Sequence, residues 1–368
     1  MNSSEHAFVI GGGPAGLVAA IALRRKGLQV TVADGGSAPG DKACGEGILP
    51  DGLSALQRLG ITLDPSEGHS FRGIRFVNAR TTAEATFPSH TGLGLRRVVL
   101  HRQLMHAAEQ SGVRLLWRTP VTGIEERRVL LGQKEILADW IIGADGYRSR
   151  VRHWAGLMPR EGGSFRYAFR QHFACAPWTD FVEVHWAAHA QLYITPVTAN
   201  EVGVVALSRN PQLRLKDALA SFPAVARRFA HSKVSTTERG ALTGNAALSA
   251  VHGGRIAVIG DASGTVDAIT GEGLSIAFQQ AEALAAAIAQ GSLASYGVAH
   301  ARLRRRPAWM ARLLLLLERH PWLQERALKI LAAEPELFRR MLAAHVGHSS
   351  PFSFAAAGAR LGWLILAA

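Results

Sequence analysis

A glycine-rich turn near the start of the chain constrains the fold more than any other feature of the sequence. The turn is Gly11-Gly12-Gly13-Pro14-Ala15-Gly16, which fits the spacing G-x-G-x-x-G. It follows a short apolar run at 6–10 that has the length of a strand, and it opens a helical pattern at 14–26. A second, β-branched run occupies 29–33. A strand, a helix and a strand in this order predict a βαβ unit whose two strands are parallel.

The spacing of the glycines predicts a site for a dinucleotide. Gly11 permits a tight turn, Gly13 lets the backbone approach a pyrophosphate, and Gly16 lets the helix pack closely on the strand. The free N–H groups and the positive end of the helix dipole then bind the phosphates. Asp34 follows 18 residues after Gly16, at the end of the second strand, where it can bind ribose hydroxyls.

The remaining chain is expected to be rich in strands in the middle and helical at the end. Alternating residues at 182–186 and 191–195 predict antiparallel strands within a strand-rich region at about 164–208. A buried strand at 255–259 precedes a long helix at about 273–290. Further helices are expected at 295–318, 321–332 and 335–345, with Pro307, Pro321 and Pro335 marking breaks or starts.

Composition excludes several classes of protein. Hydrophobic residues make up 48% of the 368 residues and charged residues 19%, which excludes disorder and a coiled coil. The two cysteines form no disulfide framework, and the pair His185 and His189 lies on predicted strands, so no metal site is expected. The N-terminus lacks a signal peptide pattern, which favours the cytoplasm, and no transmembrane helix is expected.

The charge balance favours anionic partners. There are 41 Lys and Arg against 28 Asp and Glu, a net charge of +13. The basic residues are scattered and no nucleic-acid motif accompanies them, so nucleic acid is not expected. The densest basic run precedes a very apolar C-terminal region, which suggests peripheral membrane contact through the C-terminus. A solvated basic face is the plain alternative. The run consists of Arg302, Arg304, Arg305 and Arg306.

Two later segments distinguish between dinucleotides. The segment 139–151, with Asp145-Gly146 at its centre, resembles the "DG" motif of flavoprotein monooxygenases and their relatives. The segment Gly260-Asp261-Ala262-Ser263-Gly264 resembles their "GD" motif. Together with the first glycine turn, these motifs resemble the FAD-binding class related to p-hydroxybenzoate hydroxylase over about 6–290. The resemblance implies an α/β fold with a Rossmann-like (GR2-type) FAD-binding domain, an inserted antiparallel β-sheet substrate domain and a helical C-terminus.

The same resemblance divides the chain. The FAD-binding domain is expected at 1–75, 95–163 and 240–295. The β-rich substrate domain is expected at 76–94 and 164–239, and the helical C-terminal region at 296–368.

Part of the sequence is closer to the geranylgeranyl reductase branch of these flavoproteins. Lys42-Ala43-Cys44-Gly45-Glu46-Gly47 resembles a Cys-Gly segment of that branch, and the segment 264–273, with Gly271-Glu272-Gly273, also resembles it. Cys44 is either a catalytic candidate or an inert buried thiol. Arg96 is as basic as its neighbour Arg97. FAD contacts are implied for Ala15, Asp34, Cys44, Gly45, Gly47, Arg97, Val121, Asp145, Asp261, Gly273 and Leu274.

These features predict an FAD-dependent oxidoreductase of a lipophilic or aromatic small molecule. A monooxygenase is slightly favoured, because the overall plan is hydroxylase-like and the reductase substrate motif is poorly kept. The first alternative is a reductase of isoprenoid double bonds, and the second is a non-catalytic flavin-binding protein at a membrane. No second G-x-G-x-x-G is present, so NAD(P)H is expected only as a transient electron donor. The W-x-W-x-I-P segment of flavin halogenases is absent, which argues against halogenation.

Overall fold

The computed structural model describes residues 5–159 and 165–367, and its N-terminal sequence forms a largely parallel sheet. β1 pairs in parallel with both β2 and β12, which confirms the predicted βαβ unit. Short, mainly apolar strands of this kind are typical of parallel sheets that are buried on both faces. The sheet has the order β19 (His252–Gly253), β20 (Ile256–Val258), β12 (Trp140–Gly143), β1 (His6–Ile10), β2 (Gln29–Ala33) and β8 (Arg114–Leu116).

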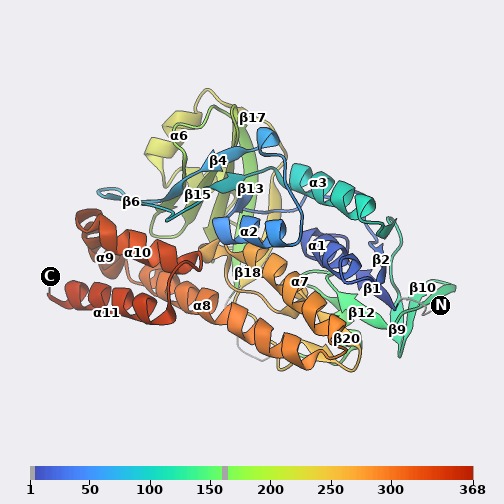
Figure 1. The fold of residues 1–368 in the computed structure, drawn as a ribbon. Helices are drawn as coiled ribbons and strands as arrows, with labels where there is room; N and C mark the ends of the chain where they lie inside the picture. Colours follow the sequence, from blue (N-terminus) through green and yellow to red (C-terminus); the bar gives the residue numbers. More distant parts are fainter. Residues whose placement is uncertain (1–4, 160–164, 368) are drawn as a thin grey trace.

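Helices and a small β-meander pack around this sheet. The first helix, α1 (Pro14–Arg24), lies between α3 (Arg97–Gln110) and α7 (Gly273–Ala289), as Figure 1 shows. The nearby helix α2 (Pro50–Arg58) contacts α7. Apolar side chains of the meander join the same core, at the end of the molecule away from the C-terminal helices. The meander consists of β9 (Gly123–Glu125), β10 (Arg128–Leu131) and β11 (Lys134–Leu137).

A second sheet of eight strands is mainly antiparallel, as the alternating patterns predicted. One pairing differs, because β5 and β14 run parallel although they come from distant parts of the chain. The pairs β5–β6, β14–β15 and β15–β16 are hairpins, which force antiparallel pairing, whereas β5 and β14 are joined by a long stretch of chain and are free to run parallel. The strands are β5 (Gly73–Val77), β6 (Thr82–Thr86), β13 (Phe165–Ala174), β14 (Phe181–Trp186), β15 (Gln191–Thr198), β16 (Glu201–Ser208), β17 (Lys233–Val234) and β18 (Arg239–Gly244).

The predicted domain boundaries at 75/76 and 239/240 fall within strands β5 and β18 of this second sheet. The division into domains stays a prediction. Residues 1–4, 160–164 and 368 of the predicted ranges lie outside the described residues. A three-stranded sheet adjoins the second sheet, because two of its strands, β4 and β7, contact β15. Its strands are β3 (Gly47–Ile48), β7 (Gly92–Gly94) and β4 (His69–Phe71).

The C-terminal part is helical, as predicted. It contains α8 (Ala294–Arg319), α9 (Pro321–Ala333), α10 (Pro335–His345) and α11 (Pro351–Ala367). Pro321 and Pro335 begin helices, but the break expected at Pro307 is wrong, because this residue is buried inside α8. Proline removes one backbone hydrogen bond, and the packing of α8 against α7, α9 and α10 outweighs that loss. Within 5–159 and 165–367, no helix combines the length and apolarity needed to cross a membrane.

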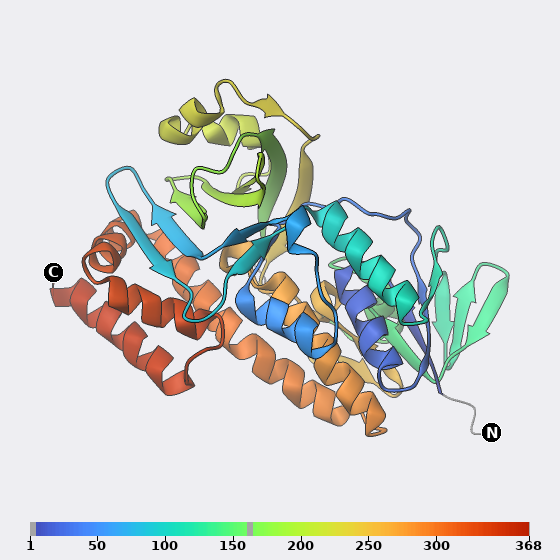
Figure 2. The same ribbon diagram turned by 45° about the horizontal axis from the view of Figure 1, so that its top comes forward.

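The second sheet separates two apolar clusters. One face packs against the short helices α5 (Leu215–Leu219) and α6 (Pro223–Phe229). Towards α9 and α10, the hairpin β5–β6 packs on the C-terminal helices, as Figure 2 shows. Phe76 of β5 stacks on Phe338 of α10 with the ring centroids 5.0 Å apart. The C-terminal helices therefore complete the wall of the space beneath this sheet.

Candidate functional site

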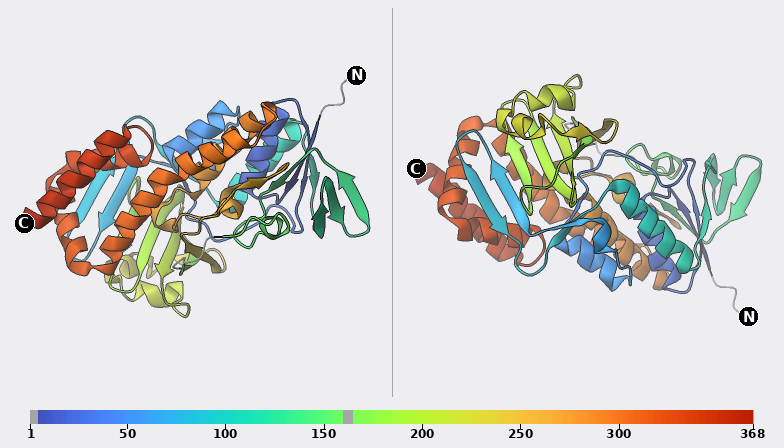
Figure 3. Two further views of the ribbon diagram at one scale, coloured as in Figure 1. Left: turned by 90° about the horizontal axis from the view of Figure 1, so that it is seen from below. Right: turned by 90° about the horizontal axis from the view of Figure 1, so that it is seen from above.

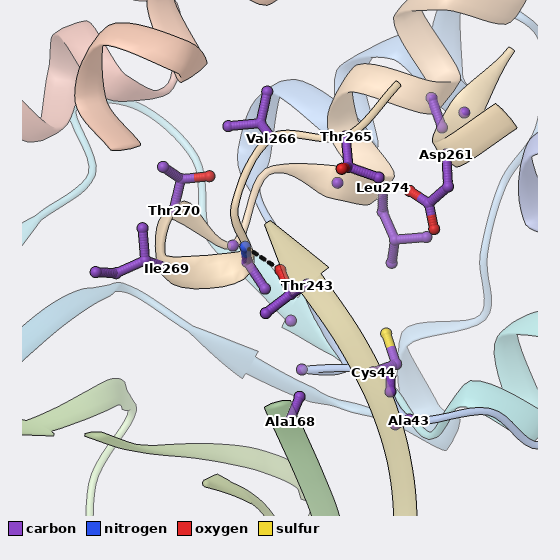
Figure 4. A pocket seen from close by; sticks show the side chains of 18 of the residues that line it. Ala43, Cys44, Ala168, Thr243, Asp261, Thr265, Val266, Ile269, Thr270 and Leu274 are labelled. Atoms are coloured by element: carbon purple, nitrogen blue, oxygen red, sulfur yellow. Dashed lines mark hydrogen bonds between the residues drawn. The ribbon is translucent and has the colours of Figure 1, made fainter. Parts of the chain in front are cut away.

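One cavity of about 650 Å³ reaches from the glycine turn to the C-terminal helices. Its first end lies at the carboxyl ends of β1 and β2, where open α/β sheets bind ligands. Its other end is walled by apolar side chains of the second sheet and of α8 to α11. Figure 4 shows Cys44, Asp261 and Leu274 on one side of the middle section, and Val266, Ile269 and Thr270 on the other. We call the two parts the cofactor end and the apolar end.

The glycine turn contains one glycine that is closely packed and one whose side-chain position is open. A Cβ atom on Gly16 would lie 1.9 Å from the carbonyl oxygen of Gly11, so a side chain there would force the helix off the strand. A Cβ atom on Gly13 would meet no atom closer than the Arg97 guanidinium, at 3.8 Å. Gly11 adopts a φ of 109°, which favours glycine. Gly13 therefore leaves bare backbone facing the cavity, as a pyrophosphate requires.

Two polar side chains hold the turn in place. Asp34 accepts hydrogen bonds from the backbone N–H groups of Gly12 and Gly36, both at 2.7 Å. His101 donates from Nε2 to the carbonyl of Gly12 at 2.6 Å, because its Nδ1 accepts from the N–H of Gly40 at 2.8 Å. Burial lowers the pKa of His101, which keeps the ring neutral in this arrangement. The sequence assigned no role to His101, since nothing along the chain connects it with Gly12.

The structure also separates the two neighbouring arginines. The Arg97 side chain lies beside Gly13 and lines the cavity, and its Nε has no hydrogen-bond partner among the described residues. The Arg96 guanidinium instead forms an ion pair with Glu201, at 2.8 Å. Arg97 is thus the cation available to a phosphate, and Arg96 is engaged in a structural contact.

The two aspartates of the later motifs also reach the cofactor end. Asp145 accepts hydrogen bonds at Oδ2 from the first N–H groups of α4 (Arg150–Trp154), while its buried Oδ1 has no partner within the part of the chain described. Asp261 follows β20, and its exposed surface faces the cavity. Burial by the surrounding protein raises the pKa of Asp261, and Arg97 opposes this effect. Both carboxyl groups can accept hydrogen bonds from a bound ligand.

A buried acid–base pair supports the loop around Cys44. Glu46 has a φ of 59°, accepts a hydrogen bond from the Arg97 N–H at 2.8 Å, and contacts Nε2 of His172 at 2.5 Å. Thr195 donates to the carbonyl of Gly45 at 2.9 Å. Burial raises the pKa of Cys44, so the thiol stays protonated and is a poor nucleophile at neutral pH. The pair of Glu46 and His172 was not predicted, because its two residues lie in different predicted domains.

The cavity brings together almost every residue predicted to contact a cofactor. Only Gly16 lies outside its lining, in the packing role described above. Gly45 and Gly273 would place a Cβ atom in open space. These open glycines and the unpartnered Arg97 and Asp145 atoms fit a phosphate-bearing ligand of the size of FAD. The lining includes Gly11, Gly13, Ala15, Asp34, Cys44, Gly45, Gly47, Arg97, Val121, Asp145, Asp261, Gly273 and Leu274.

A buried ion pair fixes the loop between the two ends of the cavity. The Arg166 guanidinium contacts both carboxylate oxygens of Asp267, at 2.5 and 3.2 Å, and both side chains are nearly inaccessible to solvent. Asp267 also accepts a hydrogen bond from the N–H of Ile269 at 2.9 Å. Tyr193 donates to the carbonyl of Ile269 at 2.9 Å. Figure 4 also shows Thr243, which accepts from the N–H of Ala268 at 2.7 Å.

A second buried cluster lies where α7 and α10 meet the cavity. His345 donates from Nε2 to the carbonyl of Thr270 at 3.0 Å, and its Nδ1 lies 3.5 Å from Oε2 of Glu272. Arg306 lies 3.7 Å from Glu272 and 3.9 Å from Asp51. Burial raises the pKa of Glu272 well above its usual value and lowers the pKa of His345 to about 4, with Arg306 opposing the first shift and adding to the second. Burial therefore favours the neutral form of both groups.

Comparison with known proteins agrees with this site. A sequence model of the FAD binding domain family matches residues 5–295. The chain is 28% identical over 328 residues to the menaquinone reductase of Mycolicibacterium smegmatis, covering 81% of this chain and 80% of that protein. It is 33% identical over 165 residues to digeranylgeranylglycerophospholipid reductase 1 of Methanothermobacter thermautotrophicus, covering 41% of each chain.

Two further likenesses extend over most of the chain. It is 26% identical over 382 residues to a putative 2-heptyl-3-hydroxy-4(1H)-quinolone synthase of Rhodococcus erythropolis, covering 94% of this chain and 93% of that protein. A flavoprotein/dehydrogenase structure from Cytophaga hutchinsonii superposes with a TM-score of 0.84 at 19% identity, covering 98% of both chains. This last likeness shows the fold alone. The resemblance and the fold class inferred from the sequence motifs are confirmed.

Proposed function

The chain belongs to the FAD binding domain family and is an FAD-dependent oxidoreductase, and from this premise we propose that it reduces a carbon–carbon double bond of an isoprenoid-like lipid. The observation that carries the proposal is the continuity of the cavity. One space of about 650 Å³ joins the cofactor end to an apolar end enclosed by the second sheet and the C-terminal helices.

The chemistry of the apolar end favours a long hydrocarbon over a small polar aromatic. Its walls are side chains such as Val184, Leu314, Phe338 and Met341, and they contribute no charge. Tyr193, the phenol nearest to them, already donates to a backbone carbonyl. Apolar pockets bind through buried area and shape, and a few polar groups fix the orientation. A prenyl chain meets these conditions along its whole length.

The relatives support the same direction. The menaquinone reductase matches over about four-fifths of both chains, and the lipid reductase matches over 41% of each chain. These two relatives favour a reductase over the monooxygenase that the sequence favoured. NAD(P)H is proposed as the donor that reduces the cofactor, and it would bind transiently because the sequence has a single dinucleotide motif.

The residues of the cofactor end would hold FAD. Gly13 and Arg97 face the position for its pyrophosphate, and Asp145 and Asp261 offer carboxyl oxygens to its hydroxyl groups. Once reduced by the nicotinamide donor, the cofactor would supply a hydride and return to its oxidised form, and reduction of a double bond requires one proton in addition. The apolar walls exclude water from the reacting carbons, which prevents competing reactions.

The buried cluster at Glu272 can provide a proton beside the cavity. Burial raises the pKa of Glu272 and favours its protonated form, and Nδ1 of His345 lies 3.5 Å from its Oε2. His345 itself lines the cavity from α10. The imidazole is held at the wall of the substrate space by its bond to the Thr270 carbonyl, and Glu272 lies behind it as the proposed source of the proton.

Monooxygenation is the second candidate. The observation that favours it is the match to the putative quinolone synthase over nearly the whole chain. The two reactions differ in the fate of oxygen, because a monooxygenase adds an oxygen atom to its product and a reductase adds two hydrogen atoms.

Product mass decides between the two reactions. Purified protein is incubated with NADPH or NADH and a menaquinone that carries an unsaturated prenyl chain, first without oxygen and then under ¹⁸O₂. We expect a gain of two hydrogen atoms in the prenyl chain, which persists after any quinol is reoxidised to the quinone, and no ¹⁸O label under ¹⁸O₂. Incorporation of ¹⁸O would overturn the reductase and establish the oxygenase. Absence of both products, with FAD bound and reducible by dithionite, would overturn the substrate class.

A further inference from the structure

The outward face of α8 has a regular pattern that the proposed chemistry does not use. Exposed positions recur every three or four residues, which is the spacing of one helix face. Val298 is 73% exposed, Trp309 45% and Leu316 46%. Exposed arginines alternate with these apolar residues along the same face. They are Arg302, Arg305, Arg312 and Arg319.

These four arginines are available to an external anion. In residues 5–159 and 165–367, none of them forms an ion pair. The two other arginines of the basic run turn inward instead. Arg304 donates to the carbonyls of Ala246 and Thr265, and Arg306 faces Asp51 and Glu272. The helix therefore divides its arginines between a buried structural set and an exposed set.

α11, which approaches α8 at Trp309, carries further exposed apolar residues. Trp363 is 67% exposed and Leu366 84%. The two helices meet where the Trp309 ring approaches Gly358, at which a Cβ atom would lie 3.4 Å from the indole. The left view of Figure 3 shows α8 and α11 on the same side of the molecule. We define the α8/α11 face as Val298, Trp309, Leu316, Trp363, Leu366 and the four exposed arginines.

We propose that the α8/α11 face docks on the surface of an anionic lipid bilayer. Helices that lie in a bilayer interface carry cationic residues and bulky apolar residues, including tryptophan, and bind through buried apolar area and attraction to anionic lipid. The α8/α11 face contains both the cationic residues and the bulky apolar residues. Nucleic acid would use the arginines but would leave Leu316, Trp363 and Leu366 in water. This combination favours a lipid surface.

The position of the cavity gives the docking a consequence. Met310, Leu314 and Leu317 line the apolar end from the inner side of α8, while Trp309 and Leu316 lie on its outer side. A helix is about 10–12 Å across, and an interfacial helix sinks about 5–10 Å into the headgroup boundary. Docking would thus bring the apolar end within about one helix diameter of the lipid. This consequence rests on the proposed function, whereas the docking itself does not.

Vesicle flotation tests the docking with a matched control. The holoenzyme is mixed with vesicles of phosphatidylcholine alone or with added phosphatidylglycerol. The double variant R305E/R312E removes two cations from the α8/α11 face. The control K216E/R227E makes the same change of charge on α5 and α6, which lie on the opposite side of the molecule (Figure 1). FAD absorbance and circular dichroism check that each variant is folded.

The expected results separate a specific face from general basicity. Each basic residue near an anionic surface contributes about fivefold to binding. R305E/R312E should therefore bind anionic vesicles at least about 25-fold more weakly, and K216E/R227E should stay within about threefold of wild type. A further variant, W363S/L366S, should lose the binding that persists at high salt, because this part does not depend on charge.

Several outcomes would overturn the docking. Equal loss of binding in R305E/R312E and K216E/R227E would show that only net charge matters. Equal binding of wild type to neutral and anionic vesicles would remove the role of the arginines. Binding to DNA or to an acidic protein without any binding to vesicles would assign the face to another partner. Turnover of detergent-dispersed substrate should be unchanged in R305E/R312E, so a failure of the docking and a failure of the proposed reaction are distinguishable.

Discussion

The two ends of the cavity are built in different ways. The cofactor end consists of backbone from a few short segments, such as the glycine turn at 11–16 and the loop at 271–274. The apolar end consists of single side chains from elements far apart in the sequence, including β5, β14, α8 and α10. A pyrophosphate is bound by local backbone geometry, whereas a hydrocarbon is bound by the shape of a space. Ligand binding at the cofactor end can therefore be disrupted by one added Cβ atom. Binding at the apolar end depends mainly on the volume of the side chains that line it.

Charge is also handled differently at the two ends. At the cofactor end, the charged side chains of Arg97, Asp145 and Asp261 line the cavity, where a ligand can reach them. Around the apolar end, Arg166 and Asp267 neutralise each other, and burial favours the neutral forms of Glu272 and His345. The first arrangement binds a charged molecule, and the second protects an apolar one.

The largest expected effect separates two glycines of the same turn. Gly16→Val places a side chain against the Gly11 carbonyl, at 1.9 Å for the Cβ atom alone, and should prevent stable folding, at a cost above about 3 kcal/mol. Gly13→Val should leave a folded chain, because its Cβ atom has room, but should weaken FAD binding by about tenfold to a hundredfold. Thermal unfolding and FAD fluorescence quenching measure the two effects.

The exposed Gly362 of α11 provides the control for both, because its Cβ atom would meet no neighbour within 4 Å. Gly362→Val should change neither folding nor FAD affinity. Wild-type FAD affinity in Gly13→Val would refute the assignment of the glycine turn as the pyrophosphate site.

The next effect concerns the pH dependence of stability near the apolar end. The pKa of His345 is about 4 in the folded protein, below its usual 6.5, so the unfolded chain binds the extra proton as the pH falls through this window. Stability should fall by as much as about 3 kcal/mol between pH 6.5 and 4, and His345→Gln should flatten this slope. Glu272 has a raised pKa, so its contribution has the opposite sign, and stability falls as the pH rises above 4.5.

Urea unfolding at a series of pH values distinguishes the two groups. Glu272→Gln should flatten the loss of stability above pH 4.5 and leave the acid slope. Glu109→Gln on the exposed side of α3 serves as the control and should change neither slope in this range. Identical pH profiles for wild type and both buried variants would contradict the burial of neutral groups at this site.

The third comparison uses adjacent arginines. Arg97→Gln should weaken FAD binding by about tenfold or more, because a hydrogen bond to a charged group contributes about 1.5–3 kcal/mol. Arg96→Gln should lower the melting temperature through the loss of its ion pair with Glu201 and leave FAD affinity within about twofold. The reverse result, with FAD affinity lost only in Arg96→Gln, would exchange the two assignments.

The smallest effect is expected from filling the apolar end. Ala168 of β13 lines the cavity, and Ala168→Phe should reduce turnover of a long prenyl substrate by about tenfold while FAD content stays the same. Ala359→Phe on the exposed side of α11 is the control for an added aromatic ring. A parallel loss of FAD in Ala168→Phe would show that the two ends are not independent.

The sequence by itself determined the cofactor end. The glycine spacing at 11–16, the run at 29–33 and the two aspartate motifs identified an FAD-binding α/β fold, and the structure gathers those residues around one cavity. This was predictable because each turn depends on residues that are neighbours in the chain. The helix starts at Pro321 and Pro335 followed for the same reason, since proline acts on its own turn.

Only the tertiary structure decided the rest. It distinguished Arg97 from Arg96, paired Glu46 with His172 across 126 positions, and kept α8 continuous through Pro307. It also placed His345 beside Glu272, although 73 positions separate them in the sequence. Such contacts leave no local pattern, because the energy of burial depends on which distant surfaces meet. The apolar end was therefore outside the reach of the sequence, since its shape exists only once two sheets and four helices have packed together.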